Sequence, residues 1–120
     1  MNEYIQNEMK NLFIRALDYA ENANRILTEP TYLEVDYAAV ACCANAAYTN
    51  ANAARIIYLL NFSGNRDKGT EDVLSQFDIF MKEATKAIET KSRMQLDSEV
   101  DALQKAYKKR YDEFSEDSNE

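Results

Sequence analysis

Glycine and proline are almost missing from this sequence: its 120 residues contain two glycines and one proline. Sheets and irregular folds need such residues at the many points where the chain reverses direction. Alanine, leucine, lysine, glutamate and glutamine, which favour helices, make up 49 of the 120 residues instead. We therefore predict a single all-α domain.

Apolar residues recur at steps of three and four, which indicates four amphipathic helices. The predicted helices cover about residues 2–27 and 32–60, then 70–90, and finally a segment after residue 97 that ends near residue 114. Pro30 separates the first two helices, because proline cannot continue a helical hydrogen-bond ladder. We expect Thr70 to cap the third helix, followed by acidic residues that suit the helix dipole.

Long helices joined by short connections are typical of an antiparallel up-and-down bundle of four, or with one further helix five, members. We assign residues 1–115 to this domain and 116–120 to an acidic flexible tail. At 1.5 Å per residue the first two helices are each roughly 40 Å long and the last two roughly 30 Å. The shorter pair should leave part of the first hairpin open to a partner.

Charge and hydropathy exclude several classes of partner. The net charge is −7, and the last nine residues, DEFSEDSNE, hold five acids and no base. The rest of the chain is therefore nearly neutral, without the basic field that steers proteins to nucleic acid. We find no signal peptide and no apolar run of about 18 residues, so we expect no membrane partner. Cys42 and Cys43 are adjacent, and we predict two buried, reduced thiols in a cytoplasmic protein.

The segment DYAAVACCANAAYTNANAARIIYLL, residues 36–60, has two surfaces on a helical wheel. The surface of small residues comprises Ala39, Cys42, Cys43, Ala46, Ala47, Ala53, Ala54 and Ile57. Small side chains let helix axes approach closely. Neither surface is charged enough to face water throughout, so we predict that this helix is central and packed on several sides.

The second surface supplies the candidate site. It carries Tyr37, Ala41, Asn45, Tyr48, Thr49, Asn52, Arg55, Ile56 and Leu59. The predicted interaction face on it comprises Tyr37, Asn45, Tyr48, Asn52 and Arg55. Amides, phenols and a guanidinium in a row can bond across to the first helix, form a subunit interface, or bind a small anionic ligand. Asn50 points into the surface of small residues, where a buried amide needs a hydrogen-bond partner on another helix or in water. It is either a polar group that fixes helix register or a ligand contact.

Several kinds of chemistry lack their residues. The sequence has no histidine, which removes the commonest general base and the ligands of ferritin-like di-iron sites. Adjacent cysteines on a helix point about 100° apart and cannot share a zinc ion. In the loop SGNRDKG, Gly64 and Gly69 have the spacing of a phosphate-binding loop, but Thr70 stands where that motif requires lysine. We therefore predict no catalytic residue, metal ligand or cofactor. We interpret Lys105, Lys108, Lys109 and Arg110 as a solvated basic patch that meets the acidic tail.

The segment ANRILTEP followed by YLEVDYAAVACCANAAYTNANAARIIYLL resembles the bacterial HEPN-like helical bundles. In particular it is similar to a group of short bacterial proteins with an alanine- and tyrosine-rich second helix and no assigned function. The resemblance covers roughly residues 10–90 and rests on pattern. It implies a bundle of four or five helices that often dimerises. Catalytic members are metal-independent ribonucleases with an Arg-x(4–6)-His motif, which cannot be carried over to a chain without histidine.

The sequence thus favours a cytoplasmic, non-enzymatic bundle that acts through protein association, as a homodimer or with another protein. A small-ligand or nucleotide-binding bundle is the alternative. A ribonuclease relative that has lost its catalytic histidine is a further one. The resemblance also implies binding modules that act beside toxins or nucleotidyltransferases.

Overall fold

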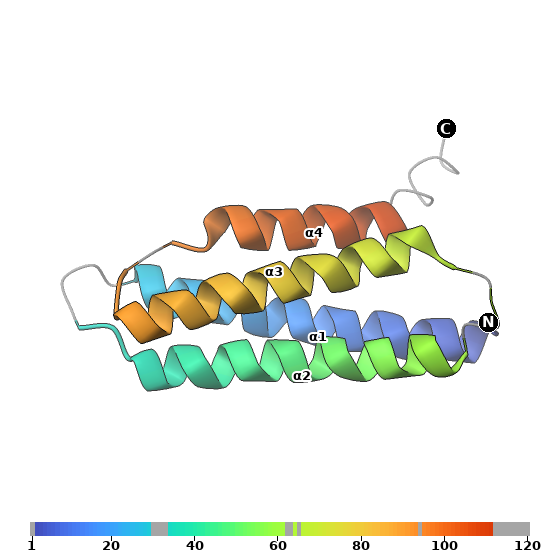
Figure 1. Cartoon of the computed structure of the whole chain (residues 1–120), viewed down its shortest axis with the longest axis horizontal. Coiled ribbons are helices and arrows are strands. Elements are labelled where there is room, and N and C mark those ends of the chain that lie inside the picture. Colours follow the sequence, from blue (N-terminus) through green and yellow to red (C-terminus); the bar gives the residue numbers. More distant parts are fainter. Residues whose placement is uncertain (1, 30–33, 62–63, 65, 94, 112–120) are drawn as a thin grey trace.

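The computed structural model describes residues 2–29, 34–61, 64, 66–93 and 95–111, and this part of the chain is helical without strands. The helices are α1 (Glu3–Thr28), α2 (Tyr37–Leu60), α3 (Lys68–Thr90) and α4 (Asp97–Tyr111). Their order and number confirm the predicted all-α four-helix bundle (Figure 1). The turn at Pro30 and the acidic tail lie outside the described residues.

Successive helices run in opposite directions, and the connections alternate between the two ends of the bundle (Figure 1). Neighbours around the bundle are α1 with α2, α2 with α3, α3 with α4, and α4 with α1. Accordingly, α1 and α3 face each other diagonally across the core. Phe13 of α1 and Phe77 of α3 meet there in a stacked arrangement, with ring centroids 6.1 Å apart and planes within 9°.

The predicted apolar faces of α1, α3 and α4 are buried, but α2 differs from the prediction. Its buried residues form a single row: Val40, Ala44, Ala47, Ala51, Ala54 and Tyr58. The opposite side of the helix is exposed. The prediction that this helix is central is therefore wrong, because α2 packs against α1 and α3 on one side and faces solvent on the other. Its alanines let α2 lie close against the core along one row.

Two helix starts also differ from the prediction. Asp67 rather than Thr70 caps α3, since its Oδ1 accepts a hydrogen bond from the Thr70 N–H at 3.2 Å. Thr70 lies inside the helix and is fully buried. The α2 helix begins at Tyr37, later than predicted, with Asp36 as its cap. In both cases a carboxylate at the preceding turn is the acceptor that the orphan N–H groups need.

The break between α3 and α4 is confirmed. Lys91 ends α3 in the left-handed conformation at φ 50°, and the Ser92 N–H closes the last turn on the Ala87 carbonyl. The expected length difference holds only for α4, which has 15 residues, because α3 has 23 and nearly matches the 24 of α2. The α4 helix is therefore too short to cover α1 along its whole length, whereas α3 nearly matches the α2 helix on which it packs.

Candidate functional site

The predicted interaction face on α2 divides between two surfaces of the helix. Tyr48 and Arg55 point toward α3, where both bond to Asp78. Tyr37 is half-buried against the core, whereas Asn45 is exposed to solvent. The polar partners of α2 are thus on the third helix, and the expectation of bonds to the first helix is wrong for Tyr48 and Arg55.

The contacts of Arg55 orient its side chain without contributing much stability. Its Nη2 lies 2.7 Å from Asp78 Oδ1 and also donates to the Leu74 carbonyl at 3.5 Å. The Tyr48 hydroxyl donates to the same Asp78 oxygen at 3.2 Å. The two ion-paired side chains are 27% and 48% exposed. A pair so open contributes about 0–1 kcal/mol to folding. Within the described residues the buried Arg55 Nε has no hydrogen-bond partner.

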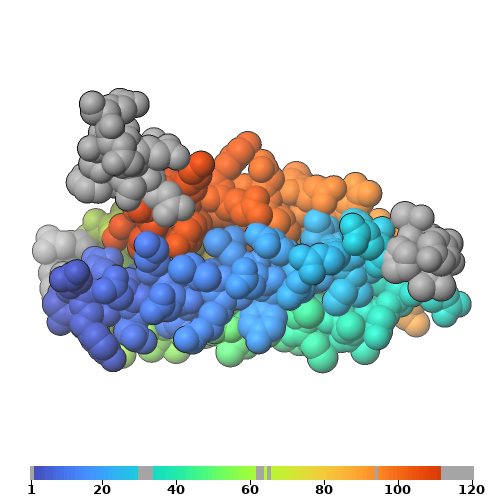
Figure 2. Space-filling view, turned by 180° about the vertical axis from the view of Figure 1, so that it is seen from behind, coloured from blue at the N-terminus to red at the C-terminus, as the bar shows by residue number. Residues whose placement is uncertain are grey.

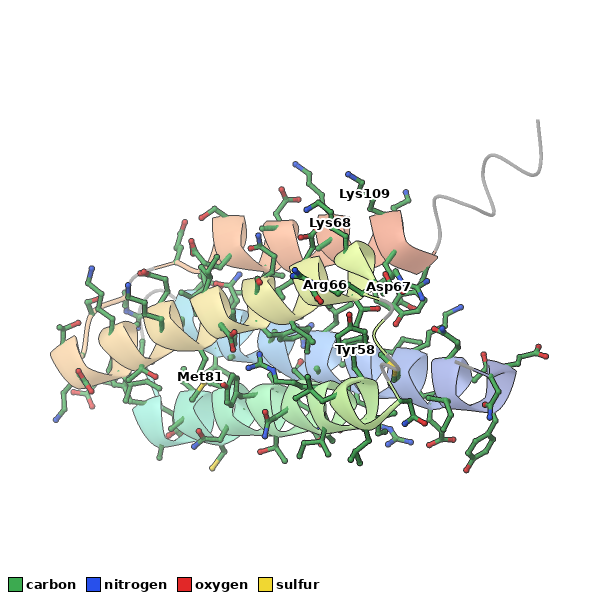
Figure 3. The ribbon with its side chains drawn as sticks, turned by 45° about the vertical axis from the view of Figure 1, so that its right-hand side comes forward. Tyr58, Arg66, Asp67, Lys68, Met81 and Lys109 are labelled. Atoms are coloured by element: carbon green, nitrogen blue, oxygen red, sulfur yellow. The ribbon has the colours of Figure 1, made fainter. Side chains whose placement is uncertain are left out.

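Arg55, Tyr48 and Asp78 lie on the wall of an open groove between α2 and α3, with a volume of about 650 Å³. Its other lining residues are Met81, Lys82, Thr85, Lys86 and Glu89. Figure 3 shows Met81 where the two helices run side by side. The side chains of Arg55, Lys82 and Lys86 attract anions, but Arg55 is already ion-paired with Asp78. An anionic ligand would have to compete with that carboxylate.

Asn50 does not hold two helices together. Its side chain is half-buried, and its Nδ2 donates to the Ala46 carbonyl one turn earlier at 2.8 Å. The predicted bond to another helix is therefore wrong, since the amide is satisfied by its own backbone. Asn61 does the same at the end of α2, where its Nδ2 donates to the Ile57 carbonyl at 2.8 Å.

A polar network ties the α2–α3 connection to the helix ends, and Figure 3 shows Tyr58, Arg66 and Asp67 close together there. The buried Tyr58 hydroxyl donates to Glu71 Oε2 at 2.9 Å and accepts from the Asp67 N–H at 2.8 Å. Arg66 bonds to both carboxylate oxygens of Glu71. The bonds from Arg66 and then Tyr58 lower the pKa of Glu71, whereas burial raises the pKa of Tyr58.

Arg110 extends this network to α4 and α1. Its Nη2 lies 2.8 Å from Asp67 Oδ2, and its Nε donates to the same oxygen at 3.0 Å. Nη2 also donates to Gln6 Oε1 of α1 at 2.9 Å. Gly69 makes room for this side chain, because a Cβ there would lie 2.6 Å from Arg110 Cδ. The prediction of a solvated basic patch is therefore wrong for Arg110.

Tyr111 carries a buried hydroxyl that makes no well-formed hydrogen bond within the described chain. Burial raises its pKa from 10.0 to about 12, although the Thr70 side chain is near enough to lower this pKa slightly. The folded protein therefore holds this proton more tightly than the unfolded chain, so stability that is fully present below pH 10.0 is lost as pH rises toward about 12.

Replacing Tyr111 by Phe is expected to stabilise the protein at neutral pH by about 1 kcal/mol, because it removes a buried hydroxyl that makes no well-formed hydrogen bond. It should also remove part of the alkaline loss of stability, on the order of 2 kcal/mol. Urea unfolding of both proteins at neutral pH and at several alkaline pH values measures both effects. A variant that is less stable and follows the same pH curve would show that the hydroxyl is well hydrated.

The solvent side of α2 is unlike the rest of the surface. We define the outer face of α2 as Ala38, Cys42, Asn45, Thr49, Asn52, Ile56, Leu59 and Leu60, which are exposed except for the half-buried Asn52. The only charged residue of α2 is Arg55, which is held by Asp78. By contrast, α1, α3 and α4 each expose both acidic and basic side chains. The α2 helix runs along one long edge of the bundle, at the lower margin in Figure 1, and part of it is visible below α1 in Figure 2.

Both cysteines are free, but the prediction that they are buried is wrong for Cys42, which is exposed on this outer face, and Cys43 is half-buried. The cause is the wheel position of the helix: the core-facing row passes through Ala44 and Ala47, about 180° from Cys42. Sequence reasoning placed Asn45, Thr49, Asn52, Ile56 and Leu59 on one surface together with Tyr48 and Arg55, so it did not separate the solvent-facing residues from those that bond to α3. Small residues occur on both sides of α2, and the row from Val40 to Tyr58 is the signal for the side that faces the core.

Comparison of the chain with models of known protein families, with curated proteins and with solved structures finds no match. Within the described residues, no helix is both long enough and apolar enough to cross a membrane. In the same part of the chain, no three histidine, cysteine or acidic side chains come together as a metal site would require.

Proposed function

We propose that this protein is a non-catalytic association module and that the outer face of α2 is its contact surface. The observation that carries the proposal is the absence of charge along this face, together with the exposure of Ile56, Leu59 and Leu60 at one end of it. Single exposed apolar residues are ordinary, but three neighbours on one helix turn form a patch. Apolar surface of this kind is stabilised when a partner removes it from water.

The corrected surface keeps part of the predicted one. Asn45 and Asn52 remain candidates for the contact, whereas Tyr48 and Arg55 are engaged by Asp78 and Tyr37 packs on the core. The resemblance to HEPN-like bundles supports the same proposal, because members of that superfamily dimerise and others act as non-catalytic binding modules. Two free thiols, one of them exposed, support a reducing compartment such as the cytoplasm.

Substituting Ile56 by Glu is expected to weaken self-association by about tenfold or more, since it buries a charge in the contact. Size-exclusion chromatography with light scattering, run over a wide range of protein concentrations, measures the affinity of self-association. The matched control is Ile79→Glu on α3, because Ile79 is 47% exposed and Ile56 52%. Equal affinity for both variants would show that the outer face of α2 is not the contact, and a wild type that stays monomeric throughout would count against self-association.

A second candidate function is binding of a small anionic ligand in the α2–α3 groove. It is favoured by the unpartnered Arg55 Nε and by Lys82 and Lys86 on the same wall. The chain has no tryptophan, so an absorbance excess beside the tyrosine band of the purified protein would reveal a bound nucleotide. If such an excess is present and disappears in Arg55→Gln, the groove is a ligand site.

A further inference from the structure

The outer face of α2 contains a continuous uncharged stripe. The residues Ala38, Cys42, Asn45, Thr49, Asn52, Ile56 and Leu59 follow one another at alternating steps of four and three, which places them in one line along the helix. Ala38, Cys42, Ile56 and Leu59 are apolar at the two ends, and Asn45, Thr49 and Asn52 are polar in the middle. In α1, α3 and α4 the apolar faces are directed at the core of this chain. In α2 this second stripe faces solvent, opposite the buried row.

Side-chain size along this stripe is graded. Its first residues, Ala38 and Cys42, are small, and its last, Ile56 and Leu59, are large. Thr49 lies at the midpoint. Residues at the same rank before and after it in the stripe are therefore matched in opposite size: Ala38 with Leu59, and Cys42 with Ile56. The two amides, Asn45 and Asn52, are the immediate neighbours of Thr49 in the stripe, each with donors and acceptors to offer the other.

We propose that the outer face of α2 packs against the same face of a second copy, with the two α2 helices antiparallel and a two-fold axis near Thr49. This inference rests on the proposed association function and names the partner and geometry. The antiparallel arrangement sets each large side chain of one copy against a small one of the other and brings Asn45 opposite Asn52. A two-fold contact needs a self-complementary surface of this kind.

Charge points to the same partner. The stripe has no charged residue, so it offers no ion pair to the charged faces of α1, α3 and α4, and a charged partner would be desolvated against it at a cost. A second uncharged stripe avoids that penalty. A parallel pairing would instead place Leu59 against Leu59 and Ala38 against Ala38, which crowds one end and leaves a gap at the other.

The area available predicts a weak dimer. The 24 residues of α2 extend about 36 Å, and a helix presents a strip about 10 Å wide, so α2 alone offers on the order of 400 Å² per copy. Stable interfaces bury roughly twice that on each partner. We therefore expect the dimer to form and dissociate readily, which calls for an experiment that traps it covalently.

The trap uses the native Cys42 and a single new thiol. Ile56→Cys is made in a Cys43→Ala background and oxidised mildly at concentrations where light scattering detects dimer. In the antiparallel arrangement position 56 of one copy faces Cys42 of the other, and the two sites are about 21 Å apart along one helix, too far for a bridge within a chain. We expect a disulfide-linked dimer that forms at least about tenfold faster than with Ile79→Cys, whose thiol meets Cys42 only by random collision.

Two further variants separate the outcomes. The Cys43→Ala parent should not cross-link, because Cys42 faces Ile56, and Ile56→Cys with Cys42→Ala should not cross-link either. Rapid cross-linking of the parent through Cys42 alone would overturn the antiparallel geometry in favour of a parallel one. Dimer by light scattering with no faster cross-link for Ile56→Cys would overturn the inference and leave the association function standing. A protein that stays monomeric and does not cross-link would overturn both.

Discussion

Phe77→Ala is expected to destabilise the protein by about 3–5 kcal/mol, the largest effect of any single substitution considered. Phe77 is fully buried on α3 and stacks on Phe13 of α1. The Phe13 ring in turn packs against the Tyr111 ring of α4, with ring centroids 6.2 Å apart. The truncation would open a cavity where aromatic side chains of three helices meet. Urea unfolding followed by circular dichroism measures the loss.

Phe77→Leu is the control for this prediction, because it keeps an apolar side chain of intermediate volume at the same site. It should cost no more than about 1–2 kcal/mol. If both variants lost the same small amount, the diagonal contact between α1 and α3 would not be the centre of the core.

Asp67→Ala is expected to cost about 2–4 kcal/mol through two separable losses. It removes the cap of α3, worth about 1 kcal/mol, and the partner of Arg110, whose side chain is only 22% exposed. Asp67→Asn separates the terms, because the amide oxygen can still accept the Thr70 N–H while the charge is lost. Asn should therefore recover the cap contribution only. Chemical unfolding of the three proteins measures both steps.

A double-mutant cycle tests whether Asp67 and Arg110 act together. The cycle combines Asp67→Asn with Arg110→Met, and we expect a coupling energy of about 1–2 kcal/mol. Additive effects would show that Arg110 stabilises the bundle through packing on Tyr111, over whose ring its guanidinium lies at 4.7 Å, and not through the carboxylate.

The helices themselves follow from local sequence. Apolar residues at steps of three and four, with few glycines and prolines, predicted the four helices, the break before α4 and the buried faces of α1 and α3. These features depend on residues within one or two turns of each other, so the pattern alone indicates them. The cap of α3 was local too, but Asp67 and Thr70 both suit that role, and the choice depended on Tyr58 and Arg110 from other helices holding Asp67 in place.

The candidate site was harder to predict because α2 has no strong amphipathic pattern. With alanine on every side, the wheel does not show which side faces the core, and the predicted contact face combined Tyr48 and Arg55, which point toward α3, with Asn45 and Asn52 of the outer face. Asp78 is the partner of Tyr48 and Arg55, yet nothing in the sequence distinguishes it from other exposed acids. A pairing between residues 23 or 30 positions apart is decided only when the helices pack.

The sequence by itself determined that this chain forms an all-α bundle, and the absence of histidine determined which catalytic arrangements it lacks. The tertiary structure alone decided that one row of α2 residues faces the core while the opposite stripe faces solvent, and that Cys42 is exposed. It also decided that Arg110 of α4 bonds to Asp67 at the start of α3 and to Gln6 of α1. The physical reason is that helix formation is a local property of the chain, whereas the rotation of a helix about its axis depends on which neighbours its side chains fit.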